Sequence, residues 1–116
     1  MTVETTDIAT QKADELAHLI YRVTASFPKT EAYGLTSQIR RASLSVVLNI
    51  IEGFARQSRN DHRRFLEIAY GSLKETKYTA QFCFEEKLIE NTDYNKIENL
   101  SNEIGRLLWG KIRRLQ

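Results

Sequence analysis

The stretch that decides the fold is residues 33–56, which read Y-G-L-T-S-Q-I-R-R-A-S-L-S-V-V-L-N-I-I-E-G-F-A-R. On a helix its polar side chains share one narrow stripe, formed by Arg41, Ser45, Asn49, Glu52 and Arg56. The apolar side chains spread over most of the remaining circumference: Ile39, Ala42, Leu44, Val46, Val47, Ile50, Ile51, Gly53 and Phe54. A helix that is apolar on more than one side must be covered on more than one side. We therefore expect this segment at the centre of a small helical bundle, with a second copy of the protein against its outer face.

Length and composition describe one helical domain. A chain of 116 residues can bury a single core without disulfides or metal ions. One proline, five glycines, 41% apolar and 28% charged residues are typical of a folded helical protein rather than a disordered or fibrous one.

The sequence also predicts a compartment. The lone Cys83 cannot form an internal disulfide, and residues 1–6 lack the basic and then apolar pattern of a signal peptide. No run approaches the roughly 18 apolar residues that a membrane span needs. We therefore expect a cytoplasmic protein that does not enter the membrane.

The 3.6-residue period of apolar positions predicts four helices, over about 7–26, 36–57, 61–87 and 93–115. The first should end before Pro28, because proline disfavours helical backbone at the residue that precedes it. The expected caps of the other three are Thr36 or Ser37, Asn60 and Thr92. Short links between long helices predict an all-α, antiparallel, up-down-up-down four-helix bundle over residues 7–116. Residues 1–6, which are polar and without period, are expected to form a frayed terminus.

This topology separates the charges. The formal net charge of +2 is too small to indicate nucleic-acid binding by itself, so any such case depends on where the charges lie. The second connection and the end of the fourth helix should share one end of the bundle and gather Arg56, Arg59, His62, Arg63, Arg64, Arg106, Lys111, Arg113 and Arg114 around Asp61. The opposite end should hold Glu31, Glu85, Glu86, Glu90 and Asp93 with Lys29 and Lys87.

Known catalytic and metal-binding patterns are incomplete. Dinuclear metal sites in bundles need two Glu-x-x-His motifs, and only Glu15 with His18 provides one, on a face turned away from the apolar stripe. There is no P-loop, glycine-rich dinucleotide fingerprint or zinc spacing. Cys83 falls on the inward face of its helix, where a buried thiol is usual. We predict no metal, no cofactor and no catalytic residue.

A polar set accompanies the central helix. Asn49 and Glu52 must find partners, and the candidates include Arg41, Ser72 and Glu75. One interpretation is a ligand site or a catalytic carboxylate; the favoured one is a structural network that fixes helix register or a subunit interface. Gly53 and Gly71 fit the latter, because a missing side chain lets helices approach closely.

Two surfaces are candidate interfaces. Trp109 lies between Arg106 and Arg113 on one helix face, where cations could hold phosphate while the indole stacks on a base. The predicted nucleic-acid-binding residues are Arg56, Arg59, Arg63, Arg64, Arg106, Trp109, Arg113 and Arg114. The alternatives are that Trp109 packs against another subunit and that the arginines form a solvated helix end. The predicted oligomer interface is Leu44, Val47, Leu48 and Ile51, which cannot all join the inner face.

Residues 33–75 resemble the four-helix bundle proteins encoded within intervening sequences of bacterial 23S ribosomal RNA genes, a family that includes the accessory protein of diversity-generating retroelements. The matching residues are Tyr33 through Ala42, Ser45, Asn49, Ile50, Glu52, Gly53, Arg56, Phe65, Leu66, Ile68, Ala69, Gly71 through Leu73, and Glu75, with Phe27 and Pro28 before them. This chain has Val47 where proline is frequent and Ile51 where alanine is usual, which makes the second helix more regular and more apolar.

The resemblance implies a homopentamer around a central channel, and nucleic-acid binding in the retroelement member. It implies no catalytic residue, and it admits a protein partner such as a reverse transcriptase. The sequence therefore favours a non-enzymatic, oligomeric nucleic-acid-binding or RNA-associated accessory protein. The alternatives are a scaffold whose basic end docks an acidic partner and, more distantly, an enzyme that uses Asn49 and Glu52.

Overall fold

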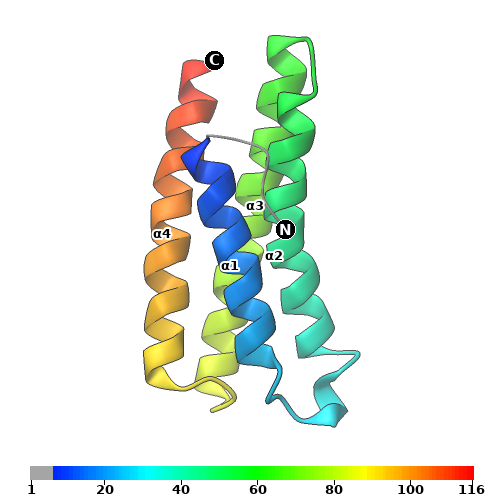
Figure 1. The fold of residues 1–116 in the computed structure, drawn as a ribbon, viewed down its shortest axis with the longest axis vertical. Coiled ribbons are helices and arrows are strands. Elements are labelled where there is room, and N and C mark those ends of the chain that lie inside the picture. Colours follow the sequence, from blue (N-terminus) through cyan, green and yellow to red (C-terminus); the bar gives the residue numbers. More distant parts are fainter. Residues whose placement is uncertain (1–6) are drawn as a thin grey trace.

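The computed structural model describes residues 7–116 and contains four long helices (Figure 1). They are α1 (Ile8–Thr24), α2 (Leu35–Phe54), α3 (Arg59–Glu85) and α4 (Asn91–Arg114), and a short 3-10 helix, η1 (Lys29–Glu31), lies in the first connection. Neighbouring helices run in opposite directions, and residues 7–116 contain no strand. The predicted all-α four-helix bundle is confirmed, whereas the predicted frayed terminus lies outside the described residues.

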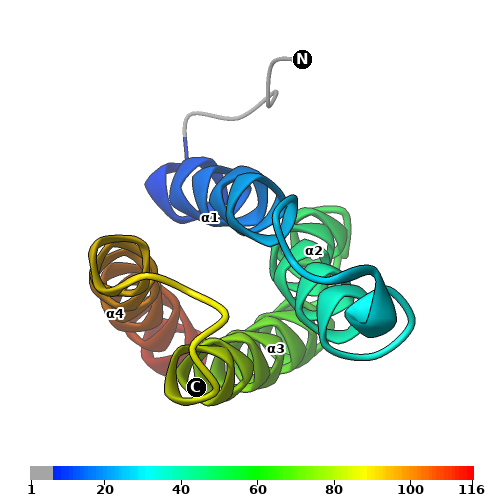
Figure 2. The ribbon, with the colours of Figure 1, turned by 90° about the horizontal axis from the view of Figure 1, so that it is seen from below.

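The helices follow one another around the bundle in chain order, as the end-on view in Figure 2 shows. Each helix packs against its neighbours in sequence, and α1 closes the bundle against α4. The side chains that face the centre are large and aliphatic, so their removal from water is the main source of stability. The largest fully buried ones are Leu16, Ile20, Ile39, Ile50, Leu66, Leu73, Ile97, Ile104, Leu108 and Ile112. Within residues 7–116, no helix is both long enough and apolar enough to cross a membrane.

Three predicted helix caps are wrong. Ser58, not Asn60, caps α3: its backbone is extended, and its hydroxyl accepts a hydrogen bond from the Asp61 amide at 3.0 Å. The helices α2 and α4 begin after Gly34 and Glu90, and neither residue makes a side-chain cap bond. The predicted caps therefore lie inside the first turns instead. Ser, Thr and Asn were assigned by type, but a cap also needs extended backbone at its own position.

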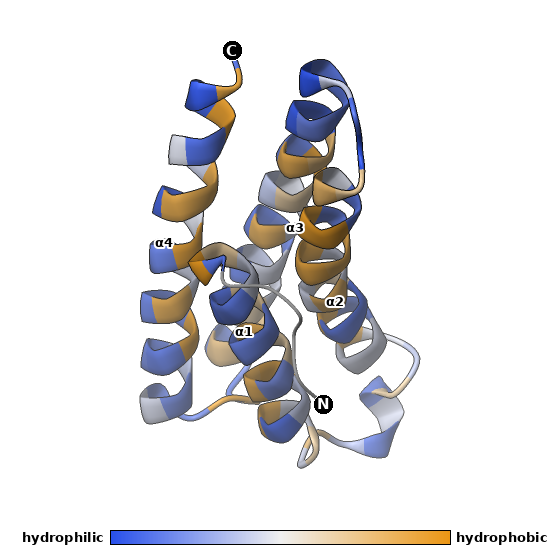
Figure 3. Cartoon of the chain, turned by 45° about the horizontal axis from the view of Figure 1, so that its top comes forward, coloured by the Kyte–Doolittle hydropathy of each residue, from blue (hydrophilic) through white to orange (hydrophobic). Residues whose placement is uncertain are grey.

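The outer face of α2 is only partly as predicted (Figure 3). Leu44, Leu48 and Ile51 are 38%, 57% and 47% exposed and form a stripe along the helix. Val47, in contrast, is only 7% exposed and belongs to the hydrophobic core. This removes Val47 from the candidate oligomer interface, since a neighbouring helix of the same chain already covers it.

Candidate nucleic-acid interface

The α2–α3 connection and the end of α4 meet at one end of the bundle (Figure 1). Arg59 joins them, because its Nε donates to the Leu115 carbonyl at 3.2 Å and its Nη2 donates to the Arg114 carbonyl. The guanidinium thus caps free carbonyls at the C-terminal end of α4. We call this region the basic end and define it as Arg56, Arg59, Arg63, Arg64, Arg113 and Arg114. Its predicted assembly from two distant segments is confirmed.

The arginines of the basic end are not equivalent. Arg56 forms an ion pair with Glu52 and lies 4.8 Å from the centre of the Phe65 ring. Arg59 is hydrogen-bonded to carbonyls at the end of α4. Arg64 lies over the same ring, at 5.1 Å, but has no carboxylate partner in residues 7–116. The last two, Arg113 and Arg114, are exposed and also lack ion pairs within the described chain. Three arginines therefore remain available to a polyanion.

Arg63 is partly buried beside the α2–α3 connection. Its Nε has no hydrogen-bond partner among the described residues, and the same is true of His62 Nε2. The His62 ring lies 5.2 Å from the Phe54 ring, so this connection is packed by aromatic contacts as well as surrounded by charge. Arg63 therefore contributes to packing, and a substitution there would change more than the surface charge.

Arg106 and Trp109 lie further along α4, away from the basic end. Arg106 precedes Arg114 by two helical turns, or roughly 12 Å. Arg106 and Trp109 line a pocket of about 270 Å³ between α3 and α4. We call it the α3–α4 pocket and define it by its lining residues: Tyr70, Leu73, Lys74, Lys77, Ser101, Asn102, Gly105, Arg106 and Trp109. The predicted nucleic-acid surface thus consists of two adjoining parts rather than one cluster.

Sequence analysis missed the α3 side of this pocket. Lys74, Lys77 and Tyr70 were not included among the candidate binding residues, although they share one helix face with Arg63 at spacings of three, four and seven residues. That spacing was a usable signal, because Arg106, Trp109 and Arg113 repeat the same combination of cations and aromatic ring on α4. To predict that these faces of α3 and α4 lie against each other, however, one must know the register between the two helices.

The expected polar network is present only in separate pieces. Asn49 Nδ2 donates to the Ser45 carbonyl at 2.8 Å and to Ser45 Oγ at 3.0 Å, and Ser45 Oγ lies 2.7 Å from Ser72 Oγ. Glu75 instead accepts a hydrogen bond from Gln38 at 2.8 Å. The structure thus adds Ser45 and Gln38, which sequence analysis had not assigned to the network.

The other two network candidates are separate from Asn49. Glu52 pairs with Arg56 on the same helix, and Arg41 lines a surface groove with Glu75. Of the two glycines, Gly53 fits the prediction of close approach, since a Cβ there would lie 3.1 Å from His62 Cδ2. The prediction for Gly71 is wrong, because a Cβ there would meet nothing within 4 Å.

Potential catalytic groups are held in ordinary environments. Cys83 is buried, and burial, together with the charge of Glu31, raises the pKa of its thiol to about 11. His18 is exposed and lies 3.5 Å from Asp14 on the same helix. Among residues 7–116 no three His, Cys, Asp or Glu side chains are grouped so that they could hold a metal ion.

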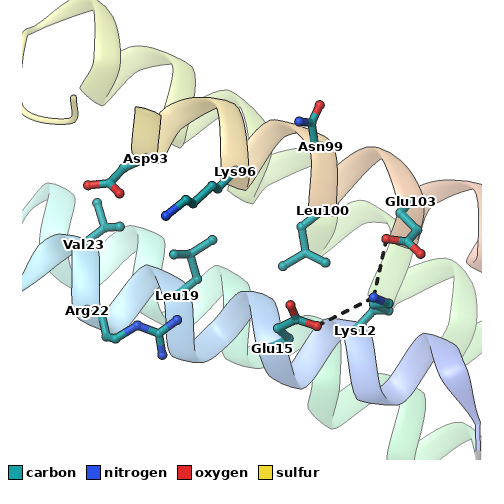
Figure 4. Close-up of a pocket in the computed structure, with 10 residues that line it drawn as sticks. All are labelled: Lys12, Glu15, Leu19, Arg22, Val23, Asp93, Lys96, Asn99, Leu100 and Glu103. Atoms are coloured by element: carbon teal, nitrogen blue, oxygen red, sulfur yellow. Dashed lines mark ion pairs between the residues drawn. The ribbon is translucent and has the colours of Figure 1, made fainter. Parts of the chain in front are cut away.

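A larger opening of about 530 Å³ lies between α1 and α4 (Figure 4). Its floor is apolar, with Leu19, Val23 and Leu100. Its rim carries both signs of charge on both helices, with Lys12, Glu15 and Arg22 on α1 and Asp93, Lys96 and Glu103 on α4. Lys12 lies 3.8 Å from both Glu15 and Glu103. Cations and anions are therefore balanced, so this groove has no preference for a polyanion despite its size.

Comparisons with known proteins agree with this architecture. Residues 6–110 match the model of a family described as 23S rRNA-intervening sequence protein. A crystal structure of a protein of unknown function from the S23 ribosomal protein family of Bacteroides thetaiotaomicron VPI-5482 is 30% identical to this chain, with a TM-score of 0.82. The alignment covers 90% of this chain and 98% of the other. No curated protein matches the sequence.

Proposed function

The chain belongs to the 23S rRNA-intervening sequence protein family, and from this premise we propose that it is a non-enzymatic, oligomeric accessory protein that binds nucleic acid. The observation that carries the proposal is the set of exposed arginines at the basic end that have neither an ion pair nor a side-chain hydrogen bond within residues 7–116, namely Arg64, Arg113 and Arg114. Arginine side chains that are already exposed can contact phosphates without first breaking an ion pair.

The distribution of charge supports binding in one orientation. Two acidic residues flank the α2–α3 connection: Glu52 near the end of α2, which pairs with Arg56, and Asp61 in the first turn of α3. The opposite end of the bundle carries Glu31, Glu85, Glu86, Glu90 and Asp93 together with Lys29 and Lys87. A phosphate backbone is therefore attracted more strongly to the basic end than to the other. Contacts of this kind are made to phosphates and not to base edges, so binding should depend little on base sequence.

Assembly would multiply this surface. The stripe of Leu44, Leu48 and Ile51 leaves apolar side chains in water on the outer face of α2, and the resemblance to the family implies a ring of five. In a ring each copy would present its own basic end, so several phosphates along one strand or duplex could be bound together. We expect this assembly in the cytoplasm.

Light scattering tests the assembly. Leu48→Glu should reduce the mass to that of a monomer without unfolding the chain, because Leu48 is the most exposed member of the stripe. Val47→Glu is the contrast, since it places a carboxylate in the core and should unfold the bundle at any oligomeric state. A wild-type protein of monomer mass at micromolar concentration would refute the assembly.

A matched pair of triple variants tests the binding. Replacing Arg64, Arg113 and Arg114 by glutamine should abolish duplex binding in an anisotropy titration at low salt, and wild-type affinity should fall steeply as salt is raised. The control replaces Arg22, Lys29 and Lys96, away from the basic end, by glutamine and loses the same charge. Absence of wild-type binding, or equal loss in the control, would favour a scaffold that docks an acidic protein.

A further inference from the structure

One end of the α3–α4 pocket is aromatic. The ring centres of Tyr70 and Trp109 lie 5.8 Å apart, and their planes are inclined by 43°. Trp109 is 49% exposed, so part of its indole remains open to solvent. Such an exposed face is a platform on which a further planar ring can stack.

The opposite end is polar and already organised. Lys77 Nζ donates to Asn102 Oδ1 at 2.6 Å and lies 3.5 Å from Glu98 Oε1. Glu98 also accepts the Tyr94 hydroxyl at 2.7 Å, and this hydrogen bond raises the pKa of Tyr94 to about 12. The nearby carboxylate is therefore occupied, while the Asn102 amide nitrogen remains a donor for the edge of a bound base.

The floor combines open space with an unused hydroxyl. Ser101 Oγ is buried and has no hydrogen-bond partner among the described residues, although buried hydroxyls normally have one. Gly105 lies beside it, and a Cβ there would come no closer than 3.6 Å to Leu73, which is ordinary contact. The glycine therefore leaves room that an alanine could occupy without strain.

The mouth of the pocket is positively charged. Lys74 Nζ lies 5.1 Å from the centre of the Tyr70 ring, and Arg106 is exposed on the α4 side. Neither side chain forms an ion pair in the part of the chain that the structure describes. The groove between α1 and α4 has matched cations and anions, so an uncompensated positive rim distinguishes the smaller pocket from the larger one.

We propose that the α3–α4 pocket binds one unpaired nucleotide. The base stacks on Trp109 beside Tyr70, and its edge meets the Asn102 amide, with the buried Ser101 beneath it. The phosphate lies at the mouth, between Lys74 and Arg106. The volume of about 270 Å³ is slightly below the roughly 300–1,000 Å³ of sites for drug-sized ligands, which suits a single base. The ligand is a planar ring that carries a phosphate, either as a free nucleotide or within a single strand.

This inference deepens the proposed function, because Arg106 and Trp109 belong to the same predicted surface. It assigns different binding roles to the basic end and to the α3–α4 pocket. The basic end holds phosphate backbone of any structure, whereas the α3–α4 pocket accepts only a base that is not paired. A strand with unpaired nucleotides should therefore engage both parts, and a duplex only the first.

Tryptophan fluorescence tests the proposal, because Trp109 is the only tryptophan in the chain. The wild-type protein is titrated with adenosine monophosphate, inorganic phosphate, a ten-nucleotide adenine strand and the corresponding duplex. We expect the mononucleotide and the single strand to change the Trp109 emission with saturation. Inorganic phosphate and the duplex should not do so, although the duplex still binds by anisotropy.

Gly105→Ala is the decisive variant. Its methyl group should weaken the mononucleotide titration by about tenfold, the scale of one lost stacked base. The same change should raise Tm by a few degrees, because alanine favours helix over glycine. Gly71→Ala is the matched control, since it should raise Tm without altering the titration. Should Gly105→Ala fold poorly, Lys74→Gln provides the second test: it should weaken binding of the mononucleotide but not of adenosine.

The outcomes separate this inference from the proposed function. Duplex binding without any saturable response to the mononucleotide or single strand would overturn the pocket and leave the basic end standing. A mononucleotide response without binding of either polymer would support a free-nucleotide site and overturn the proposed function. Unchanged titration in both Gly105→Ala and Lys74→Gln would overturn the pocket.

Discussion

The α2–α3 and α3–α4 contacts use the same kinds of residues in opposite ways. Between α2 and α3, His62 packs so closely on Gly53 that a Cβ there would lie 3.1 Å from His62 Cδ2. In the same contact, the hydroxyls of Ser45 and Ser72 are hydrogen-bonded. Between α3 and α4, Gly105 leaves unfilled space, and Ser101 has no partner among the described residues. Small and hydroxyl side chains thus complete the packing in one place and leave an opening in the other. The difference lies in whether the neighbouring helix fills the space.

The glycines should show the largest effect. Gly53→Ala would force a methyl group against His62 and Phe65, the latter at 3.3 Å, and should destabilise the fold by about 1–3 kcal/mol. Gly105→Ala should instead stabilise it by up to about 1 kcal/mol, through helix propensity alone. Urea titrations of the two variants measure both signs. If the two substitutions shift stability in the same direction, the packing contrast is wrong.

The serines should show a smaller effect. Ser72→Ala removes a partner of Ser45 and should cost about 0.5–1.5 kcal/mol. Ser101→Ala removes a buried hydroxyl that has no partner among the described residues, so stability should stay the same or rise. Thermal unfolding of both variants under one buffer condition provides the comparison. A loss of stability on replacing Ser101 would show that its hydroxyl contributes to packing after all.

The contact between α1 and α4 extends the comparison and should show the smallest effect. Asp7 Oδ1 lies 2.5 Å from Lys111 Nζ, and Asp7 Oδ2 accepts the Thr10 amide. Burial raises the pKa of Asp7, but the hydrogen bond and charge of Lys111 and the hydrogen bonds from Thr10 lower it by more, so the pKa lies below its usual value of 3.8. The stabilisation is therefore fully present above about pH 4 and is lost as the pH falls through the folded-state pKa.

Asp7→Asn isolates this charge, because asparagine caps helices about as well as aspartate does. At neutral pH the variant should be less stable by about 0.2–1 kcal/mol. The Tm values of the two proteins should converge as the solution is acidified below pH 4. A constant difference across this range would show that the charge of Asp7 has no net effect on stability.

The sequence predicted those features that depend on helix periodicity alone, and it failed where the position of a neighbouring helix or the local backbone decides. The helical period sufficed to predict that Ile39 and Ile50 lie in the core, because a strongly apolar helix face must be buried inside the bundle. Val47 was misassigned because its burial depends on which neighbouring helix of the same chain covers that side of α2. The cap at Ser58 was missed because residue type does not determine where the backbone turns extended.

The same distinction applies to the candidate interface. The basic end was predictable, because an up-and-down bundle brings the α2–α3 connection and the end of α4 together whatever the side-chain details. The α3–α4 pocket was not, because it depends on the register that sets Lys77 against Asn102 and Tyr70 against Trp109. An unpartnered hydroxyl such as that of Ser101 becomes visible only after every neighbour has been placed.

The place of α1 in the bundle has a consequence for how the protein folds. With 17 residues α1 is the shortest of the four helices, and Figure 2 shows it diagonally across from α3. The successive hairpins α1–α2, α2–α3 and α3–α4 form through contacts local in sequence, whereas the contact of α1 with α4, which includes the ion pair of Asp7 with Lys111, joins nearly opposite ends of the chain. We therefore expect the α1–α4 contact to close last, so that the amide hydrogens of the short α1 exchange with solvent faster than those of α3.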